Sequence, residues 1–337
     1  SILPETIDPN SVTGVSTEQL NPCATSTCTA EETAAGKDNI ADLVVTTGPG
    51  TPTYTILSTD TTTALAVGDQ SNDDRDTALG DVNGDNVPDL IVASYDAPNR
   101  VYYGDPARPG DFSSTRFDEF GVASDKTVAV EAFDVDTSDI TTVDLLVGNE
   151  NAPDRLLLGS GGGLDTDSGT GRFDEGYITQ DIPGSAVGTT TDVAVAVGVG
   201  NDPTSVTLVM TNSDGADQLV DLTGSRKMQL LVPGSSLSSA EVLNLDVLDQ
   251  TASGVSDYNT QSVQVGDVTG DGIADVVVVF KDKTEGASVA GYVYPGVENT
   301  PLTNNLLAGS RIPFGTSAVD AVDVTLVDAV GNDGVME

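Results

Sequence analysis

Two stretches of the sequence place oxygen-bearing groups at the spacing that a hard metal cation needs. In residues 81–89 and again in 267–275, side-chain oxygens recur at the first, third, fifth and ninth positions, and the seventh position adds a backbone carbonyl. The donors are Asp81, Asn83, Asp85, Val87 and Asp89 in the first loop, and Asp267, Thr269, Asp271, Ile273 and Asp275 in the second. Because every donor is an oxygen, the pattern predicts Ca²⁺ and not zinc or copper.

Three carboxylates within nine residues repel one another unless a cation lies between them. We therefore expect calcium to stabilise the fold at each site, by an amount that grows with the ratio of calcium concentration to Kd. Gly84 stands at the fourth position of the first loop, where glycine permits a sharp backbone turn. The alternative is that these loops are ordinary Asp-Gly turns with solvated carboxylates.

Weaker copies of the pattern lie elsewhere. Residues 129–149 keep four acids around a loop with two inserted residues, and they form a third candidate calcium site. Its candidate ligands are Asp134, Asp136, Asp139 and Asp144. Residues 36–48 and 321–337 look like half-copies, and residues 192–212 keep the apolar pattern but have lost nearly all the acids, so we expect no metal there.

The composition restricts the chemistry that is possible. The chain has 337 residues, a formal net charge of −40 and no histidine. Such a charge opposes binding to nucleic acids and anionic membranes, and the missing histidine excludes His-based catalysis. The longest apolar run, near residues 276–280, is too short to insert into a membrane. We predict no enzyme activity, and the remaining enzymatic alternative is a polysaccharide-active enzyme with paired carboxylates.

Strands must position these loops, because each intact loop directly precedes a run of β-branched residues. A polar turn and a short strand that ends in glycine follow, at Gly104, Gly159 and Gly296. Short strands between Gly, Asp and Pro turns, without a long amphipathic helix, predict an all-β fold. About five repeats with a period of about 45–65 residues favour a β-propeller of four-stranded blades.

The repeated blocks resemble a known family. GDVNGDNVPDLIVAS followed by NRVYYG, and GDVTGDGIADVVVVF followed by GYVYPG, are similar to the FG-GAP/VCBS-type repeats of integrin alpha chains and many secreted surface proteins. The resemblance covers about residues 36–337. It implies a calcium ion in each intact loop, an extracellular setting and, often, adhesion or ligand binding.

The two ends of the chain differ from the repeats. We assign residues 36–337 to the propeller and residues 1–35, rich in Thr, Ser and Pro, to an N-terminal extension or linker. Cys23 and Cys28 lie in this extension, and we predict a local disulfide, with two free thiols as the alternative. We expect residues 321–328 to supply the first strand of the blade whose other strands begin at Ala41, which would close the ring. The alternative is a fragment that further repeats follow.

Together these features predict a secreted or cell-surface, calcium-stabilised propeller that acts as an adhesion or binding module. Its partner would be a protein or glycan at the cell surface. The alternative function is a structural subunit of an extracellular filament, coat or appendage, in which copies of the chain bind one another. Most of the acidic residues lie outside the candidate loops, which favours a saline or marine extracellular setting where salt screens self-repulsion.

Overall fold

The computed structural model describes eighteen stretches of the chain, and nearly all their regular structure is β. The described residues are 12–18, 42–47, 72–105, 108–134, 142–159, 177–185, 189–197, 206–213, 217–222, 226, 229–232, 234–239, 241–245, 258–282, 291–296, 311–315, 324 and 326. The exceptions are a 3₁₀ turn, η1 (Ala123–Asp125), and helical residues at 226, 229 and 230. No helix in these stretches has the length and apolar character needed to span a membrane.

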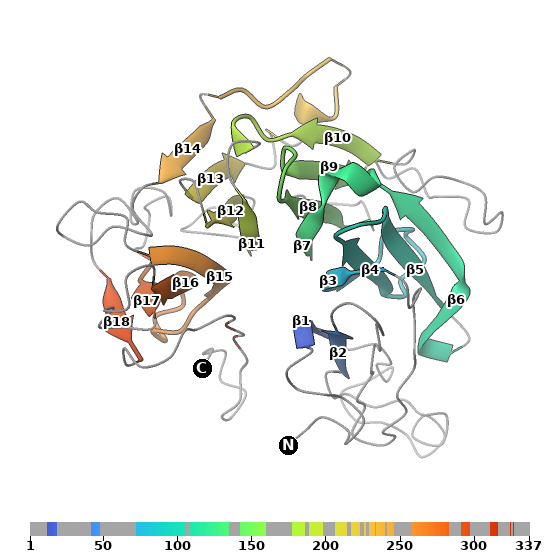
Figure 1. Cartoon of the computed structure of the whole chain (residues 1–337), viewed down its shortest axis with the longest axis horizontal. Coiled ribbons are helices and arrows are strands. Elements are labelled where there is room, and N and C mark those ends of the chain that lie inside the picture. Colours follow the sequence, from blue (N-terminus) through green and yellow to red (C-terminus); the bar gives the residue numbers. More distant parts are fainter. Residues whose placement is uncertain are drawn as a thin grey trace. The chain divides into compact units, whose positions relative to one another are not determined.

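The strands of the described residues form four sheets of four strands and one sheet of two strands (Figure 1). Sheet I contains β3 (Asp74–Gly80), β4 (Asp89–Ser94), β5 (Asn99–Asp105) and β6 (Arg108–Phe120). Sheet II contains β7 (Thr127–Phe133), β8 (Asp144–Asn149), β9 (Arg155–Gly159) and β10 (Tyr177–Asp181). Sheet III contains β11 (Thr190–Val197), β12 (Val206–Asn212), β13 (Asp217–Leu222) and β14 (Val242–Leu245). Sheet IV contains β15 (Tyr258–Gly266), β16 (Asp275–Asp282), β17 (Gly291–Tyr294) and β18 (Ile312–Phe314).

Each four-stranded sheet is a simple meander. Every strand pairs with the strand next to it in the chain, and the pairings described in sheets I, III and IV are antiparallel throughout. An up-and-down sheet of four strands is the blade of a β-propeller. The predicted fold class, an all-β chain built of four-stranded blades, is therefore confirmed.

The chain divides into two compact units. The first unit comprises residues 1–132, 140–144 and 159–178, and so contains sheet I. The second unit comprises residues 133–139, 145–158 and 179–337, and so contains sheets III and IV. Sheet II is divided between the two units.

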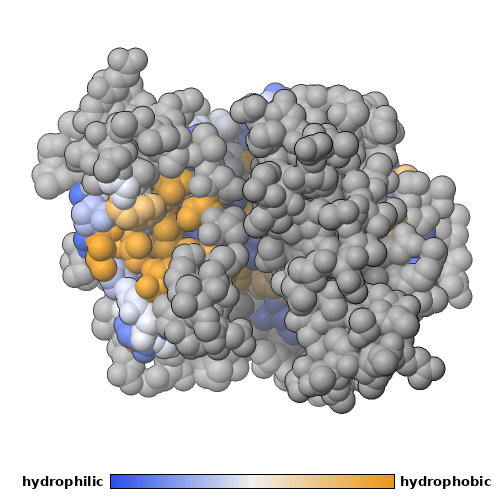
Figure 2. All heavy atoms as spheres, turned by 90° about the horizontal axis from the view of Figure 1, so that it is seen from below, coloured by the Kyte–Doolittle hydropathy of each residue, from blue (hydrophilic) through white to orange (hydrophobic). Residues whose placement is uncertain are grey.

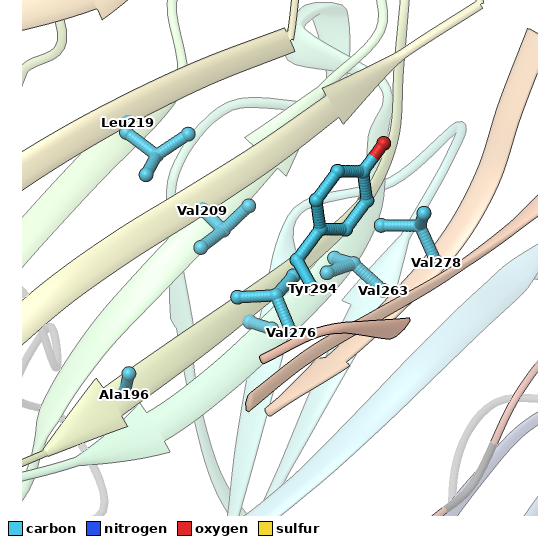
Figure 3. Close-up of a cluster of buried hydrophobic side chains, with 8 residues drawn as sticks. Ala196, Val209, Leu219, Val263, Val276, Val278 and Tyr294 are labelled. Atoms are coloured by element: carbon cyan, nitrogen blue, oxygen red, sulfur yellow. The ribbon is translucent and has the colours of Figure 1, made fainter. Parts of the chain in front are cut away.

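Apolar side chains of sheets III and IV pack into one core (Figure 3). This core contains Ala194, Ala196, Val209, Leu219, Val263, Val276, Val278 and Tyr294, each at most 4% exposed. Burying a side chain such as Val or Leu contributes about 1.5–3 kcal/mol, so this cluster is a main source of stability in the second unit. In sheet I, Leu90, Val92, Tyr102 and Phe112 form a smaller buried cluster.

The first strands of neighbouring sheets are linked by partly buried carboxylates. Register shifts next to Asp76 in β3 and Asp192 in β11 mark β-bulges. Asp76 accepts the backbone N–H of Val130 in β7 at 2.9 Å, and Asp192 accepts that of Val263 in β15 at 2.9 Å. Each carboxylate therefore joins the first strand of its sheet to the first strand of the next, as expected for adjacent propeller blades.

The two-stranded sheet gives β2 a partner that differs from the expected one. β1 (Val12–Glu18) pairs antiparallel with β2 (Asp42–Thr47), although residues 12–18 fall in the segment assigned to a linker and residues 321–328 were the expected partner. In that C-terminal segment, Val324 donates its backbone N–H to Ser262 Oγ at 3.3 Å, within the second unit. Cys23, Cys28 and the boundary at residue 35 lie outside the described residues.

Apolar surface is present in spite of the acidic composition. Figure 2 shows one face of the molecule, where apolar residues gather on the left of the view. Three large apolar side chains of the described residues are at least half exposed: Val122, Val232 and Ile312. The surface that the described residues present is therefore not uniformly charged.

A buried Asp–Gly pair, here called the Asp–Gly clasp, joins the second strand to the end of the third in sheets I, II and IV. The Oδ1 atom of the aspartate that begins the second strand accepts the backbone N–H of the glycine at 2.8–2.9 Å. The pairs are Asp89 with Gly104, Asp144 with Gly159, and Asp275 with Gly296. All three aspartates are fully buried.

Sterics explain why glycine stands in the clasp. A Cβ atom on Gly104 would lie 2.5 Å from the carbonyl oxygen of Pro88, and one on Gly296 would lie 2.4 Å from that of Ala274. At Gly159 the obstacle is the hydroxyl of Thr142, at 2.6 Å. Only glycine lets the third strand come this close to the start of the second, which accounts for the repeated strand-ending glycine of the sequence.

We predict that Gly104→Ala is strongly destabilising, because the new methyl group would push the third strand away from backbone and from the Asp89 carboxylate. The expected loss is about 3 kcal/mol or more in the free energy of unfolding, measured by denaturant titration. Gly234→Ala is the control, because Gly234 has a φ of 85° but nothing within 4 Å of a Cβ. It should lose only about 1–2 kcal/mol. If both substitutions lower the free energy of unfolding equally, the close approach of the third strand to the second does not contribute to stability.

Candidate metal centre

Loop 81–89 connects β3 to β4 and is organised around its first residue. Oδ1 of Asp81 accepts the backbone N–H of Gly84 at 2.6 Å and of Asp85 at 3.2 Å, and Oδ2 accepts that of Asn86 at 2.7 Å. The backbone can wrap around the carboxylate because Gly84 and Asn86 have left-handed φ angles of 80° and 64°. The loop is therefore a defined structure and not a flexible connection of acids.

Loop 267–275 connects β15 to β16 and repeats this arrangement. Oδ1 of Asp267 accepts the backbone N–H of Gly270 at 2.7 Å and of Asp271 at 3.1 Å, and Oδ2 accepts that of Gly272 at 2.6 Å. Gly270 and Gly272 have φ angles of 77° and 83°, so the left-handed residues are again the fourth and sixth of the loop. The sequence similarity of the two loops thus corresponds to a shared conformation.

The fifth and ninth positions also match. The fifth-position carboxylate accepts the N–H of the seventh residue at 2.9 Å, from Val87 to Asp85 and from Ile273 to Asp271. The ninth-position aspartate accepts the N–H of the second residue with its Oδ2 atom and the clasp glycine with its Oδ1 atom. In both loops this last aspartate therefore fixes strand, loop and clasp together, a role that does not depend on a metal.

The carboxylates of each loop do not converge on one point. Among the described residues, no group of three or more acidic side chains is close enough to hold a metal ion. Their oxygens are directed to backbone N–H groups, so calcium binding requires the carboxylates to turn toward one another. The chemistry of the donors, which are all oxygens, fits calcium.

Electrostatics in loop 81–89 favour a cation. Burial is the main factor that raises the pKa of Asp81, and it raises the pKa of Asp89 well above its usual range. The negative charge of Asp85 adds to both shifts, while hydrogen bonds from backbone N–H groups oppose them. A cation near these carboxylates would remove the repulsion that the protein alone leaves uncompensated.

Asn83, at the third position, gives an independent sign that this loop accommodates a further polar species. Its side chain is 6% exposed, and its Oδ1 atom accepts the N–H of Asp85 at 2.9 Å. Its Nδ2 atom is buried without a hydrogen-bond partner. A buried donor without a partner destabilises the protein, so a water molecule, such as one carried by a bound ion, would be favoured here.

The third candidate site is described only at its ends. Asp134 follows β7 and Asp144 begins β8, where it takes part in the clasp. Asp136 and Asp139 lie outside the described residues. Whether the four acids form a site therefore stays a prediction.

Two residues that the sequence does not single out hold loop 81–89 from outside. The backbone N–H of Val143 donates to the carbonyl of Asp81 at 2.9 Å. The hydroxyl of Tyr177 lies 2.7 Å from the carbonyl oxygen of Val143 and 3.3 Å from that of Val82. Burial, and then the charges of Asp144, Asp89 and Asp81, raise the pKa of Tyr177, so its hydroxyl stays protonated and can donate. No spacing rule predicts this contact between residues 95 positions apart.

Buried polar side chains also fix the turn between the second and third strands. In sheets I, II and III, one side chain accepts the backbone N–H of the residue five positions earlier. The pairs are Asn99 with Ser94, Asp154 with Asn149, and Asp217 with Asn212. Asp154 also accepts the hydroxyl of Thr190 at 2.9 Å, and Asp217 that of Thr260 at 3.0 Å, which ties each turn to the next sheet. The recurring five-residue spacing is the signal that could have revealed these residues.

Comparisons with known proteins give structural likeness only. No protein-family model matches the chain, and no curated protein matches it. The Dos1 propeller covers 84% of this chain at 10% identity with a TM-score of 0.46, and this chain covers 57% of that one. BBS1N, solved in complex with ARL6DN, shows 14% identity over 82% of both chains with a TM-score of 0.41. Chaetomium thermophilum Raptor shows 10% identity over 91% of this chain, but only 21% of its own, with a TM-score of 0.43.

Asp154 gives a prediction for pH. Burial is the main factor that raises its pKa from 3.8 to about 7, against hydrogen bonds from Asn149 and Thr190 that lower it. The fold therefore disfavours the ionised form, so the contribution of Asp154 to stability is full below pH 3.8 and is lost as the pH rises through about 7. Asp154→Asn should remove this dependence, which amounts to at most about 4 kcal/mol because one pKa unit corresponds to about 1.4 kcal/mol.

The measurement is the free energy of unfolding of both proteins from about pH 4 to pH 8, compared as a difference at each pH. Asparagine already serves at the matching position of sheet I, as Asn99, so the substitution keeps the acceptor. Asp96→Asn, at an exposed carboxylate, controls for the loss of one charge. A difference between Asp154→Asn and wild type that does not change with pH would refute the assignment.

Proposed function

We propose that this chain is a calcium-stabilised propeller of the FG-GAP/VCBS type that acts as an adhesion or binding module, secreted or at the cell surface. The observation that carries the proposal is the hydrogen-bond scheme shared by loops 81–89 and 267–275. The two repeated loops adopt left-handed conformations at the same two positions, and the first aspartate of each accepts the backbone N–H of the fourth residue. Ordinary Asp-Gly turns are not expected to share both their left-handed positions and their hydrogen bonds.

Calcium would be held mainly by the first, third and fifth positions and by the seventh carbonyl. In loop 81–89 these are Asp81, Asn83, Asp85 and Val87, and in loop 267–275 they are Asp267, Thr269, Asp271 and Ile273. The ninth-position aspartates would be weaker calcium ligands, because both of their carboxylate oxygens already accept hydrogen bonds from backbone N–H groups. Bound calcium would bring the carboxylates of each loop together and stabilise the start of the second strand.

The binding role draws its support from the sequence. The repeats resemble those of adhesion proteins, and the net charge of −40 makes nucleic acids and anionic lipid surfaces poor partners. A protein or glycan of the cell surface is the partner that we propose. The excess of acidic residues outside the loops supports a saline or marine extracellular setting.

The test of the calcium proposal is thermal unfolding with calcium and with EDTA. We expect EDTA to lower Tm by roughly 5–10 °C, because each site contributes about 2.7 kcal/mol when calcium is at 100 times Kd. Asp85→Asn and Asp271→Asn should each remove part of this calcium-dependent increment. Asp221→Asn, at an exposed acid outside the loops, should leave it unchanged.

Magnesium at the same ionic strength separates calcium binding from general charge screening. If EDTA leaves Tm unchanged and calorimetry detects no calcium uptake, the loops are Asp-Gly turns and the calcium proposal is wrong. Equal stabilisation by magnesium would also count against it, because a calcium site with a backbone carbonyl and several carboxylates is matched poorly by the smaller ion.

The proposed saline setting gives a separate prediction. With calcium saturating, lowering the salt from about 1 M to about 0.01 M lengthens the Debye screening distance from about 3 Å to about 30 Å. The self-repulsion of a chain with a net charge of −40 should then lower the denaturant midpoint of unfolding. A midpoint that is indifferent to sodium chloride over this range would argue against a saline habitat.

A further inference from the structure

The two loops share a conformation but differ in their surroundings. Each carries three aspartates, so the number of charges cannot make one bind calcium better than the other. With equal charge, the affinity of such a site depends on its rigidity and on the neutral donors. Any difference in affinity between the loops would therefore come from the residues around and within each loop.

Loop 81–89 is largely buried, and neighbouring residues outside the loop hold it in place. Val82, Asn83 and Val87 are at most 8% exposed. The N–H of Val143 and the hydroxyl of Tyr177 reach the carbonyls of Asp81 and Val82, and both groups lie in the same unit as the loop. These contacts fix the backbone that carries the first and third metal donors. The loop therefore loses less conformational entropy when an ion binds.

Loop 267–275 is open. Thr269, Gly270, Asp271 and Gly272 are all exposed. Among the described residues, every hydrogen bond to this loop comes from the loop itself or from sheet IV, and none resembles the Tyr177 contact. An ion held here would remain in contact with solvent.

The residues within the loops act in the same direction. The left-handed positions are Gly84 and Asn86 in the first loop, but two glycines in the second, and glycine loses more conformational entropy when it is ordered. The third donor is the amide oxygen of Asn83 in the first loop and the hydroxyl of Thr269 in the second. The second loop therefore loses more conformational entropy when it binds an ion.

We propose that Tyr177 is a positioning residue for loop 81–89, and that the two loops form unequal calcium sites. The first is a tight site that is integral to the fold. The second is a weaker, solvent-exposed site whose occupancy follows the calcium concentration around the protein. This inference rests on the proposed calcium function and adds to it a difference in affinity between the two loops.

The experiment is a calorimetric titration of the full chain with CaCl₂ after removal of bound metal. We expect two classes of site whose Kd values differ at least about tenfold. Asp85→Asn should remove the tight class, and Asp271→Asn should remove the weak one. These two variants assign each class to a loop.

Tyr177→Phe deletes the hydroxyl that lies 2.7 Å from the carbonyl oxygen of Val143 and 3.3 Å from that of Val82 in the loop. It should raise the Kd of the tight class about three- to tenfold, the range that the loss of one hydrogen bond produces, and leave the weak class unchanged. Tyr95→Phe is the control, because it deletes another tyrosine hydroxyl of the same unit, one that accepts a hydrogen bond from Lys126 Nζ at 3.1 Å and not one that reaches the loop. It should leave both Kd values unchanged.

Thermal unfolding distinguishes positioning from a purely structural role. If the role of Tyr177 is purely structural, Tyr177→Phe should lower Tm by the same amount in EDTA and in calcium and leave both Kd values unchanged. That result, or two loops with equal affinity, would overturn the inference while leaving the calcium proposal intact. An absence of calcium binding in the wild type would overturn both. If Tyr177→Phe does not fold in EDTA, the affinities of Asp85→Asn and Asp271→Asn decide between equal and unequal sites.

Discussion

The Asp–Gly clasp is the constraint on which the rest of sheets I, II and IV depends. Its carboxylate is buried, and a buried charge is tolerated only when its hydrogen-bonding capacity is used. Asp89 meets this condition by accepting one backbone N–H from its loop and one from the end of the third strand. The same residue therefore ends the loop, begins the central strand and sets how closely the third strand approaches. Any account of the loops as metal sites has to start from this purely protein-based role.

Sheet III shows what replaces the clasp when it is absent. Its second strand begins with Val206 and its third ends with Leu222, both at most 1% exposed, where the other sheets have aspartate and glycine. Apolar packing takes over there, as in the core shared with sheet IV. Exchanging a buried charge for well-packed apolar groups is often neutral for stability, so a blade can lose its acidic loop and keep its four strands.

Local signals made the sheets predictable. The alternation of turn residues and β-branched runs indicated strands, and the Asp loops lie directly before β4 and β16 as expected. The contacts that depend on tertiary structure have no such signal in the sequence. The pairing of β1 with β2 and the Tyr177 hydroxyl join segments whose spacing follows no rule, and the bulge beside Asp76 is not visible in composition. Nor does spacing reveal that the carboxylates of each loop face backbone N–H groups and not one another.

The pairing of every strand with its neighbour in the chain has a consequence for how the protein forms. All of sheet I lies between Asp74 and Phe120, so its strand pairing closes only short loops, and contacts of low sequence separation form quickly. Asp76 and Asp192 then offer acceptors to β7 and β15, strands that lie further along the chain. During synthesis, sheets I and III can therefore fold before the strands that donate these hydrogen bonds have left the ribosome.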